Sequence, residues 1–477
     1  MKKILLLPFL FFSGLSFSQD GYEIKVVFKP FKGEYVYLGH YFGKQYPIVD
    51  SVKLDENSTG VLKGNKKLPG GIYLIGYPNK TGFFEILIDK DQKFTVLADT
   101  GSIRKGAKFE SSPENVLFVS YQQNMNTWGS QISELTQKMK GSTGKDSAEI
   151  SKEIVKLDKQ ILNYREDLIK DNEGSLLAVL LSSMKEPQVP EEYSHPKTRA
   201  DSIAAYNYYK SHFWDGVNLW DGRLAFTPFF EPRVDKYFTQ LVMPDPDSII
   251  KEIDWMMSYA SISEEMTRFL LIKFANRYLN QKYMWEDAVF VHLFEKYFAQ
   301  KSYPWLTEAG RKTITDRAYS LMANITGKPA ADIELKDTAG KMVSLYNIPA
   351  AYTVIAIWDP TCGHCKEVIP QLDSAYHARW KSLGLKMFGL AKETDGKKSD
   401  WTTFIKDHRL FDWTHVYYSK EEDAARINAG IPGYSQLYDV QSFPTLYLLD
   451  QDKRIIGKKL TVNQIDEILA YKTKTNN

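Results

Sequence analysis

The chain has 477 residues, of which 43% are hydrophobic and 25% are charged, a composition typical of an ordinary packed protein. Its formal net charge is only +2, which argues against a nucleic-acid-binding protein or another binder of polyanions. At roughly 150 residues per domain, the length predicts about three domains.

The first residues resemble an export signal. Met1-Lys2-Lys3 is followed by an apolar run over residues 4–15 and by the small-x-small sequence Ser16-Phe17-Ser18. This order is typical of a secretory signal peptide, which we place at residues 1–19. The apolar run is short for a membrane span, and no later stretch approaches that length. We therefore expect a mature protein without a membrane span that is soluble and periplasmic or otherwise exported. An uncleaved N-terminal anchor is the alternative.

Residues 20–105 are predicted to form a β domain. Apolar and polar residues alternate in several short runs, separated by turn clusters such as residues 55–60, which we interpret as a hairpin turn. The strands are expected at residues 22–28, 34–38, 71–77, 83–88 and 94–97. The pattern predicts a small antiparallel β-sandwich.

Residues 106–325 are predicted to be helical. We expect helices at residues 175–184, 247–260, 263–279, 282–300 and 305–324. A further stripe, spaced by three and four residues, is formed by Ile150, Ile154, Leu157, Ile161, Tyr164 and Leu168. The stripe indicates a helix that packs on its neighbours or forms a dimer seam.

Segment 206–230 is unusually rich in aromatic residues. We interpret it as an irregular but ordered segment. Its rings form either helix-packing core or an exposed apolar surface for partner proteins.

Strands and helices alternate in residues 326–477. We expect strands at residues 352–358, 384–391, 445–449 and 454–458, with a short one near Val416. Helices are expected at residues 362–380, 399–408, 421–428 and 462–471. This pattern predicts a layered α/β domain closed by a hairpin, so the whole chain is expected to be multidomain: β, then helical, then α/β.

The two cysteines of the chain, Cys362 and Cys365, form a Cys-x-x-Cys pair. The pair lies where an apolar strand ending at Trp358 gives way to a helix. At such a junction the free backbone N–H groups and the helix dipole favour a thiolate. An exported protein could use structural disulfides, yet this chain has no other cysteine. The pair therefore indicates reversible dithiol–disulfide chemistry.

These residues carry a resemblance to a known family. Residues 326–477 resemble the thioredoxin superfamily, and within it the exported thiol–disulfide oxidoreductases of the TlpA and ResA type. The motifs that match are Ile357-Trp358, Cys362-Gly363-His364-Cys365, Phe443-Pro444-Thr445 and Asp450-Gln451-Asp452-Lys453. The regions before residue 326 resemble the accessory domains that often precede exported bacterial thioredoxins.

The resemblance implies a role for each cysteine and its neighbours. Cys362 is expected to attack as the thiolate, and Cys365 to resolve the mixed disulfide. Gly363-His364 is the dipeptide of protein disulfide isomerases, so His364 is expected to stabilise the thiolate and make the pair more oxidising.

The resemblance also implies a substrate-binding surface. Pro444 is expected to be a cis-proline that faces the pair and leaves the backbone of Phe443 free to align a substrate strand. We place Trp358 and Thr361 in the same surface.

Three positions depart from the family pattern. Thr361 stands where Trp is common, and Phe443 is bulkier than the usual residue. Ala356 occupies the place where thioredoxins proper bury an Asp that accepts the proton of the second cysteine. The proton acceptor for Cys365 is therefore open.

The resemblance implies no bound cofactor, because the cysteines carry the electrons. We also expect no metal, since His364 with one Cys-x-x-Cys pair lacks a fourth zinc ligand. Lys366 stands where a haem-attachment motif needs His.

We therefore expect an exported thiol–disulfide oxidoreductase. Its partners would be exported proteins with thiols or disulfides, and a redox partner that the sequence does not name. One alternative is a partner-binding or scaffold protein with a secondary redox domain. The other is a thiol peroxidase, although Pro360-Thr361-Cys362 is more compressed than a peroxidase loop.

Overall fold

The computed structural model describes residues 21–102 and 106–475, so the signal peptide expected at residues 1–19 lies outside the described residues. The chain divides into two compact units. One consists of Met1–Val242 with Asp254–Leu270, and the other of Met243–Ile253 with Leu271–Asn477. Within the described ranges, no helix is both long and apolar enough to cross a membrane.

The first unit begins with two four-stranded sheets in the orders β4-β1-β7-β8 and β3-β2-β5-β6. The strands are β1 (Tyr22–Lys29), β2 (Tyr35–His40), β3 (Ile48–Lys53), β4 (Thr59–Gly64), β5 (Gly71–Gly76), β6 (Phe83–Ile88), β7 (Lys93–Asp99) and β8 (Lys108–Glu110). Alternate residues of both sheets, such as Ile24 and Val26 from one and Val36 and Ile86 from the other, share one buried core. The expected sandwich is therefore present.

The expectation of a purely antiparallel sandwich is wrong. β1 and β7 pair in parallel, with Val26 opposite Val96. The chain between them runs through the other sheet, so no tight hairpin requires an antiparallel pair. The turn at residues 55–60 is likewise not a hairpin, because it connects β3 of one sheet to β4 of the other. Asp55 holds this turn by accepting hydrogen bonds from the backbone N of Asn57 (2.7 Å) and of Thr59 (2.9 Å).

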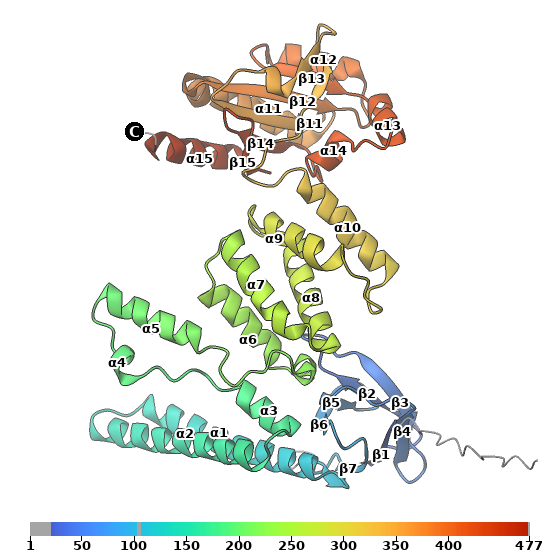
Figure 1. The fold of residues 1–477 in the computed structure, drawn as a ribbon, viewed down its shortest axis with the longest axis vertical. Coiled ribbons are helices and arrows are strands. Elements are labelled where there is room, and N and C mark those ends of the chain that lie inside the picture. Colours follow the sequence, from blue (N-terminus) through green and yellow to red (C-terminus); the bar gives the residue numbers. More distant parts are fainter. Residues whose placement is uncertain (1–20, 103–105, 476–477) are drawn as a thin grey trace, which may run out of the picture. The chain divides into compact units, whose positions relative to one another are not determined.

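Two long helices follow the sandwich, α1 (Pro113–Met139) and α2 (Lys145–Asp171), and they lie side by side (Figure 1). The predicted stripe of α2 packs on α1: the ring of Tyr164 stacks on that of Tyr121 at 6.4 Å, and Leu168 is buried in the same cluster. The packing interpretation of the stripe is confirmed at this end of the helix.

Shorter helices complete the first unit. They are α3 (Leu176–Ser183), α4 (Glu191–Ser194), α5 (Arg199–Ser211), the 3-10 turn η2 (Gly222–Phe226), α6 (Phe230–Lys236) and the π-turn η3 (Tyr237–Leu241). α7 (Pro246–Ala260) and α8 (Glu264–Leu279) contribute residues to both units.

The aromatic segment 206–230 was expected to be irregular, which is wrong for residues 206–211, because they end helix α5. A capping box in which Thr198 and Asp201 bond to each other's backbone N–H starts this helix. Farther along, Phe213 and Phe230 are buried, whereas Trp220 is 45% exposed. The segment thus contributes to the core and also to the surface.

The second unit contains α9 (Glu286–Leu293), the π-turn η4 (Phe294–Phe298) and α10 (Glu308–Met322). The helix expected to begin at residue 282 begins at Glu286, because the Glu286 carboxylate accepts hydrogen bonds from the backbone N of Lys282 and Tyr283 and holds them in a turn. α10 begins after Thr307, whose hydroxyl accepts a hydrogen bond from the backbone N of Gly310.

A five-stranded sheet in the order β13-β12-β11-β14-β15 forms the rest of this unit. Its strands are β11 (Tyr352–Trp358), β12 (Leu385–Lys392), β13 (Thr414–Tyr418), β14 (Thr445–Leu449) and β15 (Ile455–Lys458). β11, β12 and β13 are parallel, whereas β14 is antiparallel to β11 and to β15. A small hairpin of β9 (Glu334–Lys336) and β10 (Met342–Ser344) precedes them.

Both faces of this sheet are covered. Helices α11 (Gly363–Ala375), α12 (Lys398–Asp407) and α15 (Val462–Thr475) bury one face, and α14 (Tyr434–Leu437) with the β9–β10 hairpin buries the other. A further helix, α13 (Lys420–Asn428), follows β13. The central strand β11 is therefore buried from Thr353 to Trp358 and is apolar from Val354 onward, as expected for a strand covered on both sides.

Candidate active site

The two cysteines lie at the start of α11, directly after the central strand. Cys362 is the N-cap residue, with an extended backbone (φ −67°, ψ 125°), and helical geometry begins at Gly363. Cys362 is partly exposed, whereas Cys365, in the first turn, is completely buried. The thiols are not joined by a disulfide. The site thus presents one thiol at the surface and keeps the other inside.

Burial controls the acidity of the inner thiol. Desolvation raises the pKa of Cys365 to about 12; the charges of Cys362 and Asp359 act in the same direction, and a backbone hydrogen bond from Asp359 opposes them. Cys365 is therefore a protonated thiol near neutral pH.

The loop before β14 faces the outer thiol. The Phe443–Pro444 peptide bond is cis, as the resemblance implied. The Cys362 thiol donates to the carbonyl oxygen of Phe443 across 3.9 Å. The Phe443 ring is half-buried and packs against the cores on both faces of the sheet. This contact brings Cys362 next to Phe443 and Pro444, although Cys362 and Phe443 are separated by 81 positions in the sequence.

Asp359 is a buried carboxylate that the sequence analysis missed. One carboxylate oxygen accepts hydrogen bonds from the backbone N and the hydroxyl of Thr361, each at 2.7 Å, and the other accepts one from the hydroxyl of Thr394. These bonds fix the short loop between Trp358 and Cys362. The sequence did carry a signal, because Asp followed by Pro and Thr is typical of a side-chain-capped turn.

The remaining predicted site residues have different positions. His364 is exposed, and its Nδ1 lies 3.9 Å from Oε2 of Glu367. Gly363 has open space where a Cβ would be, and Thr361 is held by Asp359 at the edge of the site. Trp358 was placed in the substrate-binding surface, but it is fully buried against Phe404, with ring centroids 4.9 Å apart. As the last residue of the central strand, Trp358 has its side chain in the core, so it does not line the substrate-binding surface.

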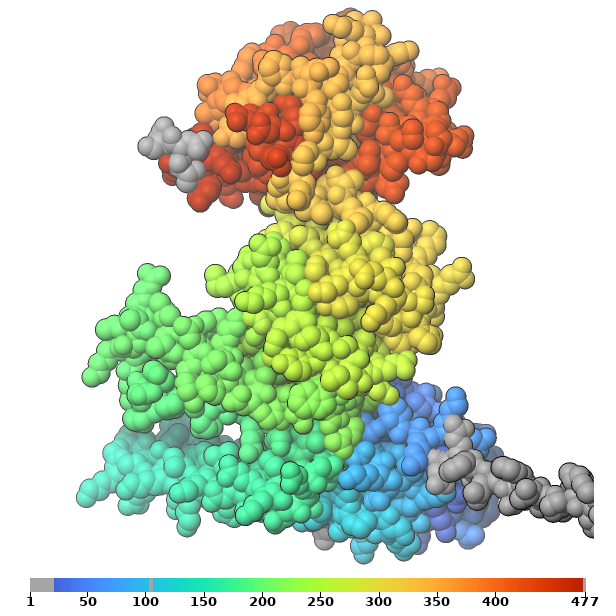
Figure 2. All heavy atoms as spheres, viewed as in Figure 1, coloured from blue at the N-terminus to red at the C-terminus, as the bar shows by residue number. Residues whose placement is uncertain are grey.

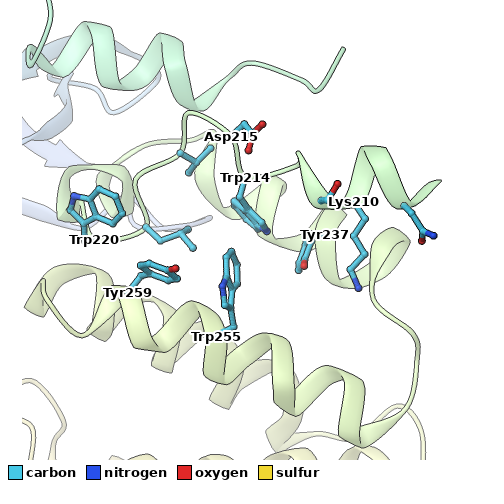
Figure 3. A pocket seen from close by; sticks show the side chains of 11 residues that line it. Lys210, Trp214, Asp215, Trp220, Tyr237, Trp255 and Tyr259 are labelled. Carbon is cyan, nitrogen blue, oxygen red and sulfur yellow. The ribbon is translucent and has the colours of Figure 1, made fainter. Parts of the chain in front are cut away.

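A second concave feature lies in the first unit, where segment 206–230 meets α7. Trp255 and Tyr259 of α7 face Trp214 and Trp220 across a pocket of about 470 Å³ (Figure 3). The rings contact each other, with centroids 6.5 Å apart for Trp214 and Trp255. No cysteine or histidine is among the lining residues, so this pocket is separate in its chemistry from the cysteine site.

No group of three or more His, Cys, Asp or Glu side chains that could hold a metal ion occurs within residues 21–102 and 106–475.

Three family models match the chain. Residues 326–458 match the AhpC/TSA family, residues 22–118 match a domain of unknown function, DUF4369, and residues 128–323 match another, DUF5106. A search of curated proteins found no match.

Several solved structures are similar to this chain. A domain of a possible thiol-disulfide isomerase from Cytophaga hutchinsonii has 29% identity, covering 31% of this chain and 94% of that one with a TM-score of 0.28. A thioredoxin-like protein from Bacteroides caccae has 20% identity, covering 60% and 98% with a TM-score of 0.43. The thioredoxin domain of a thiol-disulfide oxidoreductase from Bacteroides vulgatus has 25% identity, covering 31% and 96% with a TM-score of 0.26.

The C-terminal part of the chain is a thioredoxin-like oxidoreductase domain, with a dithiol at the N-terminus of the helix that follows the central strand. The match of residues 326–458 to the AhpC/TSA family confirms that this domain belongs to the thioredoxin superfamily, as the motifs indicated.

Proposed function

We propose that this protein is an exported thiol–disulfide oxidoreductase of the TlpA and ResA type, which exchanges disulfides with other exported proteins through Cys362 and Cys365. The observation that supports this most strongly is the arrangement of the two thiols. One lies at the surface on a helix N-cap beside the Phe443 carbonyl, and the other is buried one turn behind it.

The arrangement suits a two-step exchange. The Cys362 thiolate attacks one sulfur of a substrate disulfide, and the other substrate sulfur leaves and takes up a proton. Cys365 then loses its proton, attacks the Cys362 sulfur and releases the second substrate sulfur as a thiol. Two electrons pass from the cysteine pair to the substrate, whose two sulfurs take up the proton lost by Cys365 and one proton from the solvent. The same steps run in reverse when the pair oxidises a dithiol.

The backbone around Phe443 is the proposed contact for the substrate. A substrate strand that bonds to the backbone beside Pro444 would place its sulfur next to Cys362, because the Phe443 carbonyl already lies 3.9 Å from that thiol. The bulk of the half-buried Phe443 ring favours apolar residues in the substrate.

Trapping of mixed disulfides tests the roles of the cysteines. Full-length Cys365→Ser should accumulate mixed disulfides with protein substrates, which a reductant releases, because the resolving thiol is gone. Cys362→Ser should accumulate almost none, because the remaining thiol is buried. Equal trapping by both variants would contradict the assignment. Rapid consumption of hydrogen peroxide without protein exchange would favour the thiol peroxidase alternative.

Export is tested on the mature protein. Expressed with its own N-terminus in a host with a periplasm, the protein should be found in the periplasmic fraction and begin near residue 20. A protein that keeps residues 1–19 and stays in the cytoplasm would refute this part of the proposal.

A further inference from the structure

The loop that faces Cys362 is fixed by a buried carboxylate. Asp439 begins the run of residues that leads to Phe443 and Pro444, and its side chain is 5% exposed. Its backbone has φ +44°, in the left-handed region that few non-glycine residues adopt. A buried carboxylate is costly unless hydrogen bonds or opposite charges compensate for the lost water, and the same partners can keep the backbone in this rare conformation.

The partners of Asp439 come from three segments of the chain. Arg317 of α10 donates from Nη1 to Oδ1 at 2.7 Å, and Ser320 of α10 donates from its hydroxyl to the same oxygen at 3.1 Å. Lys459, just after β15, donates to Oδ2 at 2.5 Å, and Gln441 donates from the loop itself at 3.3 Å. Burial by itself would raise the pKa of Asp439, but the hydrogen bonds and charges of Arg317 and Lys459 lower it below its ordinary value.

A second contact ties the residues just after α10 to the helix that precedes the loop. Asn324, just beyond α10, donates to the carbonyl oxygen of Leu437 at the end of α14 (3.1 Å). Lys458 of β15 in turn donates to the backbone and side-chain oxygens of Asn324, each at 2.9 Å. In the space-filling view, the yellow-orange atoms of α10 continue into the orange and red atoms of the C-terminal domain (Figure 2). All these residues belong to the second compact unit.

We propose that α10 is a structural component of the redox site that positions the loop facing Cys362. Through Arg317 and Ser320 it holds Asp439, and thereby positions the loop whose Phe443 carbonyl faces Cys362. α10 lies in the segment that matches DUF5106, so a helix outside the AhpC/TSA match supplies positioning residues for it. This inference rests on the proposed function, because the loop matters only if a substrate is aligned there.

Full-length variants with two kinds of substrate test the proposal. A small aromatic disulfide needs access to Cys362 alone, whereas insulin must also be aligned along the loop. Arg317→Ala should slow insulin reduction roughly tenfold, mainly through a higher KM, because a charge-assisted hydrogen bond to Asp439 is lost. The rate with the small disulfide and the reduction potential of the pair should stay unchanged.

Lys312→Ala is the matched control. Lys312 is another cation of α10, but it pairs with the exposed Asp316 on the surface of its own helix. Its removal should leave both rates unchanged. If Arg317→Ala slows insulin no more than Lys312→Ala does, or slows both substrates equally, the proposal is overturned.

Milder variants keep the test valid if Arg317→Ala does not fold. Ser320→Ala removes one hydrogen bond from Asp439, and Arg317→Lys keeps the charge but loses the planar donor group. Each should slow insulin while sparing the small disulfide, by less than the alanine variant; equal effects on both substrates would again refute the role of α10. A wild type that exchanges neither substrate would refute the proposed function itself.

Discussion

The burial of Cys365 predicts how the second step of the exchange depends on pH. In the reduced pair, a pKa of about 12 gives a Cys365 thiolate fraction of about 10⁻⁵ at pH 7 and about 10⁻³ at pH 9. In the mixed disulfide the charge of Cys362 is absent, but burial, the largest cause of the raised pKa, remains. Because only the thiolate attacks, the rate at which a mixed disulfide on Cys362 is resolved should rise about tenfold per pH unit between pH 6 and 9.

The assay follows one turnover. A coloured aromatic thiol is first joined to Cys362 as a mixed disulfide, and its release reports the attack by Cys365. Cys365→Ser is the control, in which release should be absent. A rate that does not change between pH 6 and 9 would refute the reasoning, because it would mean that a group inside the site takes the proton of Cys365.

The variant Asp359→Asn tests whether Asp359 is the group that accepts the proton of Cys365. The charge of Asp359 raises the pKa of Cys365, so the neutral amide should make resolution faster at each pH. The amide oxygen can still accept the hydrogen bonds from Thr361, which keeps the loop in place. Slower resolution in Asp359→Asn would instead show that this carboxylate is the proton acceptor.

Two further predictions concern single side chains. His364→Pro should make the cysteine pair more reducing by tens of millivolts, measured against glutathione, because the family resemblance implies that this imidazole stabilises the reduced pair; an unchanged potential would mean that the exposed His364 has no part in setting the potential. Asn115→Ala should lower the free energy of unfolding by about 2–4 kcal/mol in chemical denaturation, because the buried Asn115 side chain bonds both backbone groups of Leu87, and each would lose its partner. Val116→Ala, at a neighbouring exposed position, is the control and should change little; equal losses in both variants would contradict this reasoning.

The α/β part of the fold could be predicted because its signals are local. The apolar run of β11, the Cys-x-x-Cys pair and the helical period after it lie next to each other in the sequence. Phe443-Pro444 could be added only through the resemblance, since nothing local shows that this loop faces Cys362. The direction of the Trp358 side chain was missed because a strand buried on both faces has no polar side that would reveal its orientation.

Interactions between distant residues could not be predicted in this way. Asp439 and Arg317 are separated by 122 positions, and neither stands in a motif. The parallel pairing of β1 with β7 was missed for a similar reason, because strand patterns show which residues are buried but not which strand lies beside them. The domain boundaries drawn from the sequence stay predictions.

The pairing of β1 has a consequence for the order of folding. β1 is the first strand in the described part of the chain, yet it lies inside its sheet, between β4 and β7. Both of its neighbours follow much later, and its parallel partner begins only at Lys93. Contacts between such distant segments form slowly, because a long loop must close first. In a chain that emerges from its N-terminus, Tyr22–Lys29 can pair with β4 once Thr59–Gly64 has appeared. The other edge of this strand must stay unpaired until β7 follows, near the end of the sandwich, and it is open to wrong pairing until then.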